Sequence, residues 1–194
     1  MLYGVVQSVL LYVAPVWKRA IEVDKYRKMV NALQRKMLLR YITAYRTVSA
    51  EAACVLAGIP PMDLLVRERA CLDEILEVRG IHKGVERHRT IREWQDRWEN
   101  NNRNAQWIKR LIPDVETWSA CKRSQLNYYV TQFFTGHGSF RNFTSWIGKN
   151  ADDVGIYCGM VDDAEHTLFV CDGGLGKELP TNWLRESQPP PTQL

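Results

Sequence analysis

Residues 24–45, with the sequence DKYRKMVNALQRKMLLRYITAY, form the most clearly periodic segment of this 194-residue chain. Apolar side chains recur there at steps of three and four residues, which is the spacing of one face of an α-helix. Similar patterns in the neighbouring segments predict a mainly α fold. The apolar positions are Tyr26, Met29, Val30, Leu33, Met37, Leu38 and Tyr41.

The other faces of this predicted helix are strongly basic, with seven Lys and Arg residues against Glu22 and Asp24. Rows of Lys and Arg supply many of the phosphate contacts in protein–nucleic acid complexes, and Tyr and Arg can also stack on bases. A solvated basic surface is the alternative interpretation. The candidate nucleic-acid-binding residues are Lys25, Arg27, Lys28, Arg35, Lys36, Arg40 and Arg46.

The uncharged segment at residues 2–14 is apolar nearly all round, which predicts a buried helix packed on several sides. Pro15 is expected to end this helix, because the residue before a proline is pushed out of the α region. The segment is shorter than the roughly 20 apolar residues of a membrane-spanning helix, so we expect no membrane partner. We expect the neighbours that bury it to lie in a chain segment upstream.

Further helices are predicted downstream. Ser49 is a suitable N-cap for a helix over residues 49–56, and Gly58 a suitable stop. Another helix is predicted over residues 62–78. Residues 123–134 are rich in aromatic side chains and fit either a helix or a strand.

A helix over residues 87–99 places Trp94 and Trp98, four positions apart, on one face. The three asparagines that follow, at residues 100–102, are the expected domain boundary. Tyr128, Phe133 and Phe134 lie beyond it, and aromatic residues of this kind are more often core than base-stacking surfaces.

Charge is unevenly distributed along the chain. The whole chain has a formal net charge of +4, but residues 151–194 hold eight acidic and two basic residues, a net −6, which leaves +10 for residues 1–150. A basic body favours a polyanionic partner; an unevenly charged, solvated surface is the alternative. The five cysteines lack the spacing of a disulfide framework, so we expect a reducing, intracellular compartment.

Cysteine and histidine cluster at metal-ligand spacing only in residues 136–171. His166 follows Cys158 by eight positions, and Cys171 follows His166 by five. Thiolate and imidazole groups at short separations are the ligands of structural Zn²⁺ sites, which normally have four. His137 is a candidate fourth ligand or, alternatively, a hydrogen-bonded turn residue. Inert buried thiols and a helical histidine are the alternative to zinc.

No catalytic residue is assigned. The sequence has neither a glycine-rich phosphate loop nor an HExxH motif. The carboxylate pairs Asp152–Asp153 and Asp162–Asp163 lack the setting of polymerase metal ligands, between apolar strands. We interpret both pairs as solvated loop acids.

Four segments together resemble one protein family, in the same order along the chain. They are SVLLYVAPVW (8–17), LQRKMLLRYITAYRTVSAEAACVLAGIPPMDLL (33–65), TWSACKRSQLNYYVTQFFTGHGSF (117–140) and YCGMVDDAEHTLFVC (157–171). They are similar to the C-terminal part of the Pol polyprotein of insect non-LTR retrotransposons, notably the type-1 elements that insert into ribosomal DNA. The resemblance covers about residues 2–171.

This resemblance implies a longer protein with an N-terminal endonuclease, a central Mg²⁺-dependent reverse transcriptase and a C-terminal Cys/His nucleic-acid-binding region. Residues 1–80 would be a helical, thumb-like part of the reverse transcriptase, and residues 81–104 a connecting helix and linker. Residues 105–171 would be the nucleic-acid-binding region, with a small α-rich Cys/His knuckle. Residues 172–194, which are rich in Gly and Pro, would be a disordered tail.

The sequence departs from this family at two places. The family pattern has Cys-x-x-Cys before the spaced His and Cys, so a cysteine is expected where Gly155 stands. After Cys171 the family continues with proline, tryptophan and a helix, whereas this chain continues with DGGLGKELP. The catalytic aspartates of the polymerase are absent too, so we expect no polymerase activity from the isolated chain.

The expected function is therefore that of a retrotransposon Pol segment that binds nucleic acid. Its implied partners are the element RNA, the target DNA and the rest of the polyprotein, with structural Zn²⁺ in the knuckle and the nucleus as the place of action. One alternative is a stand-alone zinc-dependent nucleic-acid-binding protein derived from such an element. Another is a helical protein-interaction module.

Overall fold

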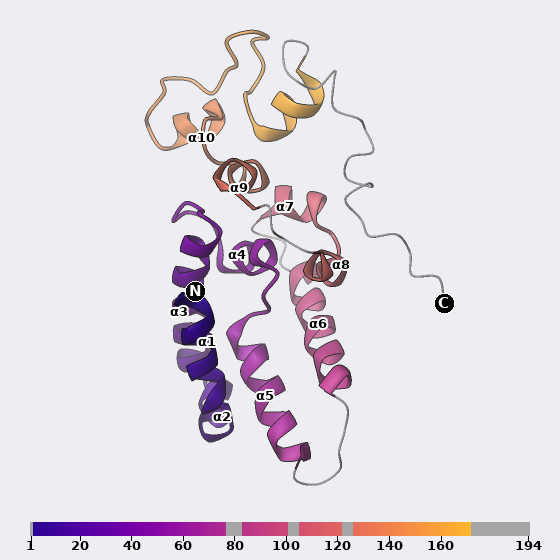
Figure 1. Cartoon of the computed structure of the whole chain (residues 1–194). Coiled ribbons are helices and arrows are strands. Elements are labelled where there is room, and N and C mark those ends of the chain that lie inside the picture. Colours follow the sequence, from indigo (N-terminus) through magenta and orange to yellow (C-terminus); the bar gives the residue numbers. More distant parts are fainter. Residues whose placement is uncertain (1, 77–82, 101–104, 122–125, 172–194) are drawn as a thin grey trace, which may run out of the picture. The chain divides into compact units, whose positions relative to one another are not determined.

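The computed structural model describes residues 2–76, 83–100, 105–121 and 126–171. The chain divides into two compact units, Met1–Ala120 and Cys121–Leu194. Both units are built from helices, and no strand forms in the described ranges, so the predicted mainly α fold is confirmed (Figure 1). The tail predicted to be disordered, residues 172–194, lies outside the described residues.

The first unit is a helical bundle around one central helix. Helix α5 packs against α1, α2 and α3 on one side and against α6 on the other (Figure 1). Helix α4 packs against α3 and α8. The described helices of this unit are α1 (Leu2–Tyr12), α2 (Ala14–Glu22), α3 (Asp24–Tyr41), α4 (Ala50–Ala57), α5 (Met62–Leu76), α6 (Lys83–Asn100), α7 (Gln106–Leu111) and α8 (Val115–Ala120).

The ends of α4 follow from local chemistry, as predicted. The Ser49 side chain accepts a hydrogen bond from the Ala52 backbone N–H at 3.1 Å, which satisfies one of the free donors of the first turn. Gly58 ends the helix with φ +58°, a left-handed conformation that glycine adopts at little cost.

Pro15 has a different role from the one predicted. Helix α1 already ends at Tyr12, and Pro15 lies in the first turn of α2, which begins at Ala14. A proline fits there because the backbone N–H groups of a first helical turn have no intrahelical partner. The proline therefore helps to begin the second helix, and the prediction that it ends the first was wrong.

One core cluster of the first unit forms where α2 meets α5. Ala14 and Ile21 from α2 pack with Met62, Leu65 and Val66 from α5, and all five are buried. In α6, Trp94 and Trp98, which their spacing placed on one face, are both buried. The Trp98 indole N–H also donates to the Ile112 carbonyl at 2.9 Å, which ties α6 to the segment after α7.

Two expected apolar faces are only partly covered. Helix α1 is not buried on all sides, since the exposed fractions of Val5, Val9 and Tyr12 are 62%, 62% and 82%. In α3 the predicted apolar face turns partly outward, where Tyr26, Met29, Leu33 and Tyr41 are exposed.

The buried face of α3 is centred on a polar residue, Gln34. Its amide group donates to the Tyr3 hydroxyl at 3.2 Å and to the Pro60 carbonyl at 2.9 Å, and it accepts from the Met62 N–H at 2.7 Å. A buried amide with its hydrogen bonds satisfied costs little to bury. Hydrogen bonds to distant residues therefore rotate α3 away from the orientation that its apolar period predicts.

The chain divides after Ala120, whereas the sequence indicated residues 100–102, of which 101 and 102 lie outside the described residues. Helices α7 and α8 consequently lie in the first unit. Trp118 of α8 donates its indole N–H to the Val55 carbonyl of α4 at 2.7 Å, a bond across 63 positions of sequence. The assignment of thumb, linker and knuckle functions to the sequence ranges stays a prediction.

The second unit has two short helices and a turn of π-helix within its described residues. They are α9 (Tyr128–Thr135), α10 (Arg141–Trp146) and η1 (His166–Val170). Helix α9 resolves the helix-or-strand ambiguity for residues 128–134; residues 123–125 lie outside the described residues. The Asn127 side chain accepts from the Val130 N–H at 2.9 Å to begin this helix, and Gly136 ends it with φ +67°.

None of the helices in the described ranges combines the length and the apolar character that crossing a bilayer requires.

Candidate metal centre and nucleic-acid interface

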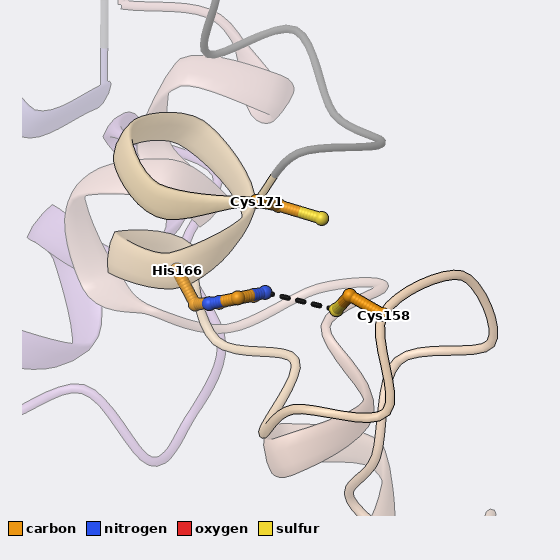
Figure 2. A group of neighbouring side chains, drawn as sticks. All are labelled: Cys158, His166 and Cys171. Carbon is orange, nitrogen blue, oxygen red and sulfur yellow. Dashed lines mark hydrogen bonds between the residues drawn. The ribbon is translucent and has the colours of Figure 1, made fainter.

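The second unit brings together the three predicted metal ligands Cys158, His166 and Cys171. One ligand atom from each lies within 4.8 Å of the other two. Figure 2 shows Cys158 on a loop, with its thiol toward the His166 ring, and Cys171 at the far end of the helical turn that begins at His166. The His166 Nε2 atom is 3.0 Å from the Cys158 sulfur.

A tight loop positions Cys158. Val154 and Val161 pair as an isolated antiparallel bridge, and inside it the Gly155 N–H donates to the Met160 carbonyl at 2.7 Å. A hydrogen bond from the Met160 backbone lowers the pKa of the Cys158 thiol, and His166 lowers it further. The loop therefore favours the thiolate, which is the form that binds metal.

Two carboxylates position the histidine side of the cluster. Asp163 accepts from the His166 N–H at 2.7 Å, at the start of η1. Asp162 accepts from the Thr167 hydroxyl at 2.6 Å and from the Arg141 N–H at 3.1 Å. Both aspartates are half-buried, so the interpretation of this pair as solvated loop acids was wrong.

These three residues fit Zn²⁺ by their chemistry and spacing. Two thiolates and an imidazole are ligands that zinc takes in structural sites. Ligand atoms at about 2.0–2.3 Å from one tetrahedral metal lie roughly 3.5–4 Å apart. The three ligand atoms lie at most 4.8 Å apart, so a small adjustment of the side chains would bring them to the separations that a shared metal requires.

The structure does not bring His137 into this group. Its Nδ1 atom lies 2.7 Å from the Thr135 carbonyl oxygen, and its ring packs edge-on against Phe143, with centroids 4.4 Å apart. Burial lowers the pKa of His137 below its ordinary value. These contacts match the alternative interpretation, a hydrogen-bonded turn residue.

Asp152 also lies outside the three-residue group. It is exposed and pairs with Arg141, whose Nη2 atom is 2.7 Å from the carboxylate. This ion pair lowers the pKa of the Asp152 carboxyl. Asp153 contacts this region only through its backbone in the bonds described: its carbonyl accepts a hydrogen bond from the Asp162 N–H at 2.8 Å.

The candidate nucleic-acid-binding cations lie on α3 and in the loop after it, in the first unit, and they separate into two sets. In the first set, a carboxylate or backbone carbonyls already hold most of the side chains. Arg27 and Lys28 both pair with Asp24, which neutralises part of their charge. Arg35 is half-buried and donates to the backbone carbonyls of Val48 and Arg46, so it holds the loop after α3. Lys25 also belongs to this first set. It is exposed and lies beside Tyr26, at the N-terminal end of α3.

Lys36, Arg40 and Arg46 form the second set, here called the α3 cation cluster. All three are exposed, and in the described part of the chain none of them forms a salt bridge. They line a pocket of about 550 Å³ at the C-terminal end of α3. Its other lining residues are Arg35, Leu39, Thr43 and Ala44, so no acidic residue opposes the cations.

Sequence reasoning missed an aromatic pocket in the second unit. Tyr128 and Tyr129 are exposed and, with Phe133 and Phe140, line a pocket of about 310 Å³. Only Phe134 of the predicted core aromatics is fully buried. The signal in the sequence was the pair of adjacent tyrosines, Tyr128 and Tyr129. Adjacent residues of a helix point in different directions, so both rings cannot pack into the core on one side of a short helix.

Curated proteins similar to this chain come from insect retrotransposable elements. The putative 115 kDa protein in type-1 retrotransposable element R1DM of Drosophila melanogaster is 28% identical over 211 residues, which cover 94% of this chain and 21% of the relative. The retrovirus-related Pol polyprotein from type-1 element R1 4 of Nasonia vitripennis is 26% identical over 87% of this chain and 46% of its own length. A type-1 element R1 Pol polyprotein of Bradysia coprophila is 25% identical over 87% of this chain and 18% of its own length.

The resemblance to insect type-1 element Pol polyproteins is thereby confirmed, and the chain spans less than half the length of each of these relatives. No protein-family model matches the chain. No solved structure matches it.

Proposed function

We propose that this chain, a homologue of insect type-1 retrotransposable-element Pol polyproteins, is a segment of such a polyprotein that binds nucleic acid. Its ligands would be the element RNA and the target DNA, in the nucleus. Reverse transcription and DNA cleavage, with Mg²⁺, belong in this proposal to the rest of the polyprotein. This chain supplies binding surface and no catalytic group.

The observation that carries the proposal is the α3 cation cluster. Lys36, Arg40 and Arg46 present three positive charges around one pocket, and no acidic residue is among the described residues that line it. Cations that neutralise phosphates release condensed counterions, and this release drives most non-specific nucleic-acid binding. Arg27 and Lys28 have less to gain from a phosphate, because Asp24 already pairs with them.

A salt series tests this part of the proposal. Fluorescence anisotropy of a labelled duplex should give a log affinity that falls linearly with log salt concentration, by roughly 0.9 per phosphate contacted. The variant Lys36→Ala/Arg40→Ala/Arg46→Ala should reduce that slope by up to about 2.7. The control variant Arg27→Ala/Lys28→Ala removes one charge fewer and should reduce it by less than about 1, because Asp24 already offsets these charges.

Two results would count against the cation cluster. Absence of binding by the unaltered chain at low salt would remove nucleic acid as the ligand. Slope changes in proportion to the three and two charges removed, about 2.7 and about 1.8, would show that binding follows net charge and does not depend on this pocket.

The second part of the proposal is that Cys158, His166 and Cys171 hold Zn²⁺. When bound, the metal would join the loop that carries Cys158 to the turn that carries the other two ligands. The zinc content of the purified protein should fall on Cys158→Ser and on His166→Ala. Cys71→Ser is the matched control, because Cys71 is also a half-buried free thiol and lies in α5, outside the cluster. Unchanged zinc in the first two variants would reject the site.

One observation favours a protein-interaction module as the second candidate. Val5, Val9 and Tyr12 on α1 leave an apolar surface exposed, as do Met29 and Leu33 on α3. Apolar surface of this kind often marks protein contacts. Two results together would favour this candidate. The chain would bind no nucleic acid in the salt series, and sedimentation would show self-association that increases with protein concentration.

A further inference from the structure

Gly155 lies three positions before Cys158 and beside the sulfur of this cluster residue. A Cβ atom placed on Gly155 would be 3.4 Å from the Cys158 sulfur, 3.5 Å from the Met160 carbonyl oxygen and 3.7 Å from the Asp162 Cβ. These are ordinary van der Waals distances, so a Cβ atom fits without displacing its neighbours. Gly155 is also absent from the residues with positive φ, so its backbone suits any residue.

The described neighbours of this position do not replace the missing ligand. Asp162 is near, but one of its carboxylate oxygens accepts from Thr167 and the other from Arg141. His137 is held by the Thr135 carbonyl and Phe143. Among the described residues, the cluster therefore offers zinc three protein ligands.

We propose that this chain binds Zn²⁺ through three protein ligands, and that the fourth coordination position, on the Gly155 side, is open to water or a small anion. The inference rests on the zinc ligation proposed above and gives that site an exchangeable ligand. Zinc with three protein ligands and one exchangeable ligand differs from the closed, four-ligand structural sites. A substitution that returns a thiol to position 155 should close the site.

Cobalt substitution tests the coordination directly. Co²⁺ replaces Zn²⁺ in such sites, and its thiolate charge-transfer and d–d absorption bands report ligand type and geometry. In the full chain loaded with Co²⁺, sodium azide should shift the d–d bands of the unaltered protein, because azide displaces the exchangeable ligand. In Gly155→Cys, azide should have no effect, and the charge-transfer intensity should rise in proportion to three thiolates in place of two.

Zinc affinity gives a second readout. Competition with a chromophoric chelator should show that Gly155→Cys binds Zn²⁺ about a hundredfold more tightly than the unaltered chain, since each ligand carries a share of the binding free energy of a structural site. Gly155→Ala is the control for the added Cβ atom. Gly84→Cys is the control for an added thiol, because its Cβ would meet no atom within 4 Å. Both controls should leave zinc affinity within about threefold of the unaltered chain.

Each outcome decides the inference. Azide-insensitive cobalt bands in the unaltered chain would show a fourth protein ligand and overturn it. An affinity of Gly155→Cys equal to that of Gly155→Ala would also overturn it, because the added thiol would then not reach the metal. Loss of zinc binding in every variant would reject the metal site itself and leave the salt-series test of nucleic-acid binding unaffected.

Discussion

The variant Arg97→Ala should destabilise the first unit by about 3 kcal/mol, because it leaves a buried carboxylate without its cation. The Asp63 side chain is 0% exposed. It accepts from Arg97 of α6 at 2.8 Å and from the Asn31 amide of α3 at 3.0 Å. Asp63 therefore joins three helices, and the interaction with Arg97 supplies its only charged partner among the described residues.

The magnitude follows from the exposure of the two partners. Removing one member of a buried ion pair costs about 3–5 kcal/mol. The Arg97 side chain is 36% exposed, so water can enter the space it leaves and reduce the cost to the lower end of that range. Arg67→Ala is a matched control, because the carboxylate that pairs with Arg67, Glu93, is 40% exposed, and exposed pairs are typically worth about 0–1 kcal/mol.

Urea unfolding followed by tryptophan fluorescence measures both variants, since Trp94 and Trp98 are buried on the same helix as Arg97. With an m-value of about 2 kcal/mol/M, Arg97→Ala should lower the midpoint by about 1.5 M. Arg67→Ala should lower it by less than about 0.5 M. Adding Asp63→Asn to Arg97→Ala should recover part of the loss, because the buried charge is then gone. Equal midpoints for the two arginine variants would refute the reasoning.

Four further predictions concern local structure. Gly58→Ala should destabilise the first unit by about 1 kcal/mol in the same urea assay, because Gly58 has φ +58°. Gly84→Ala should stabilise it by up to about 0.5 kcal/mol, because Gly84 is the second residue of α6 and a Cβ atom added there meets no atom within 4 Å; a loss of stability in Gly84→Ala would contradict the argument. Ser49→Ala should cost about 1 kcal/mol through loss of the N-cap of α4, and Ser49→Asp should restore most of it. His137 has its pKa lowered by burial, so the unfolded chain binds a proton more readily than the folded one just below pH 6.5. The stability of the second unit should therefore be complete above about pH 6.5 and fall as the pH drops below it. His137→Asn should remove that part of the pH dependence, as measured by circular dichroism during thermal unfolding at pH 5 and pH 7.5; an unchanged dependence would contradict the assignment.

Features set by neighbouring residues could be predicted from the sequence. Ser49 and Gly58 cap α4 through contacts within a few positions, and the spacing of Trp94 and Trp98 placed both on one face of α6, the face that is buried. The Cys/His cluster was predictable for the same reason. Cys158, His166 and Cys171 lie within 14 positions of one another, so a loop and one helical turn suffice to bring them together.

Features set by distant partners could not be predicted. The orientation of α3 depends on Gln34, whose partners Tyr3 and Pro60 lie 31 and 26 positions away. The inclusion of α8 in the first unit depends on the bond from Trp118 to Val55. The positioning roles of Asp162 and Asp163 depend on hydrogen bonds to the start of α10, at Arg141, and to the turn that carries His166 and Thr167. These hydrogen bonds leave no periodic pattern in the sequence.

The geometry of Gly155 has a consequence for how copies of such an element would diverge. A glycine codon that ends in a pyrimidine becomes a cysteine codon by a change of its first base alone. The backbone at position 155 accepts either residue, and its surroundings leave room for the added Cβ atom. A lineage could therefore gain or lose the fourth ligand in one mutational step, with no compensating change in the loop.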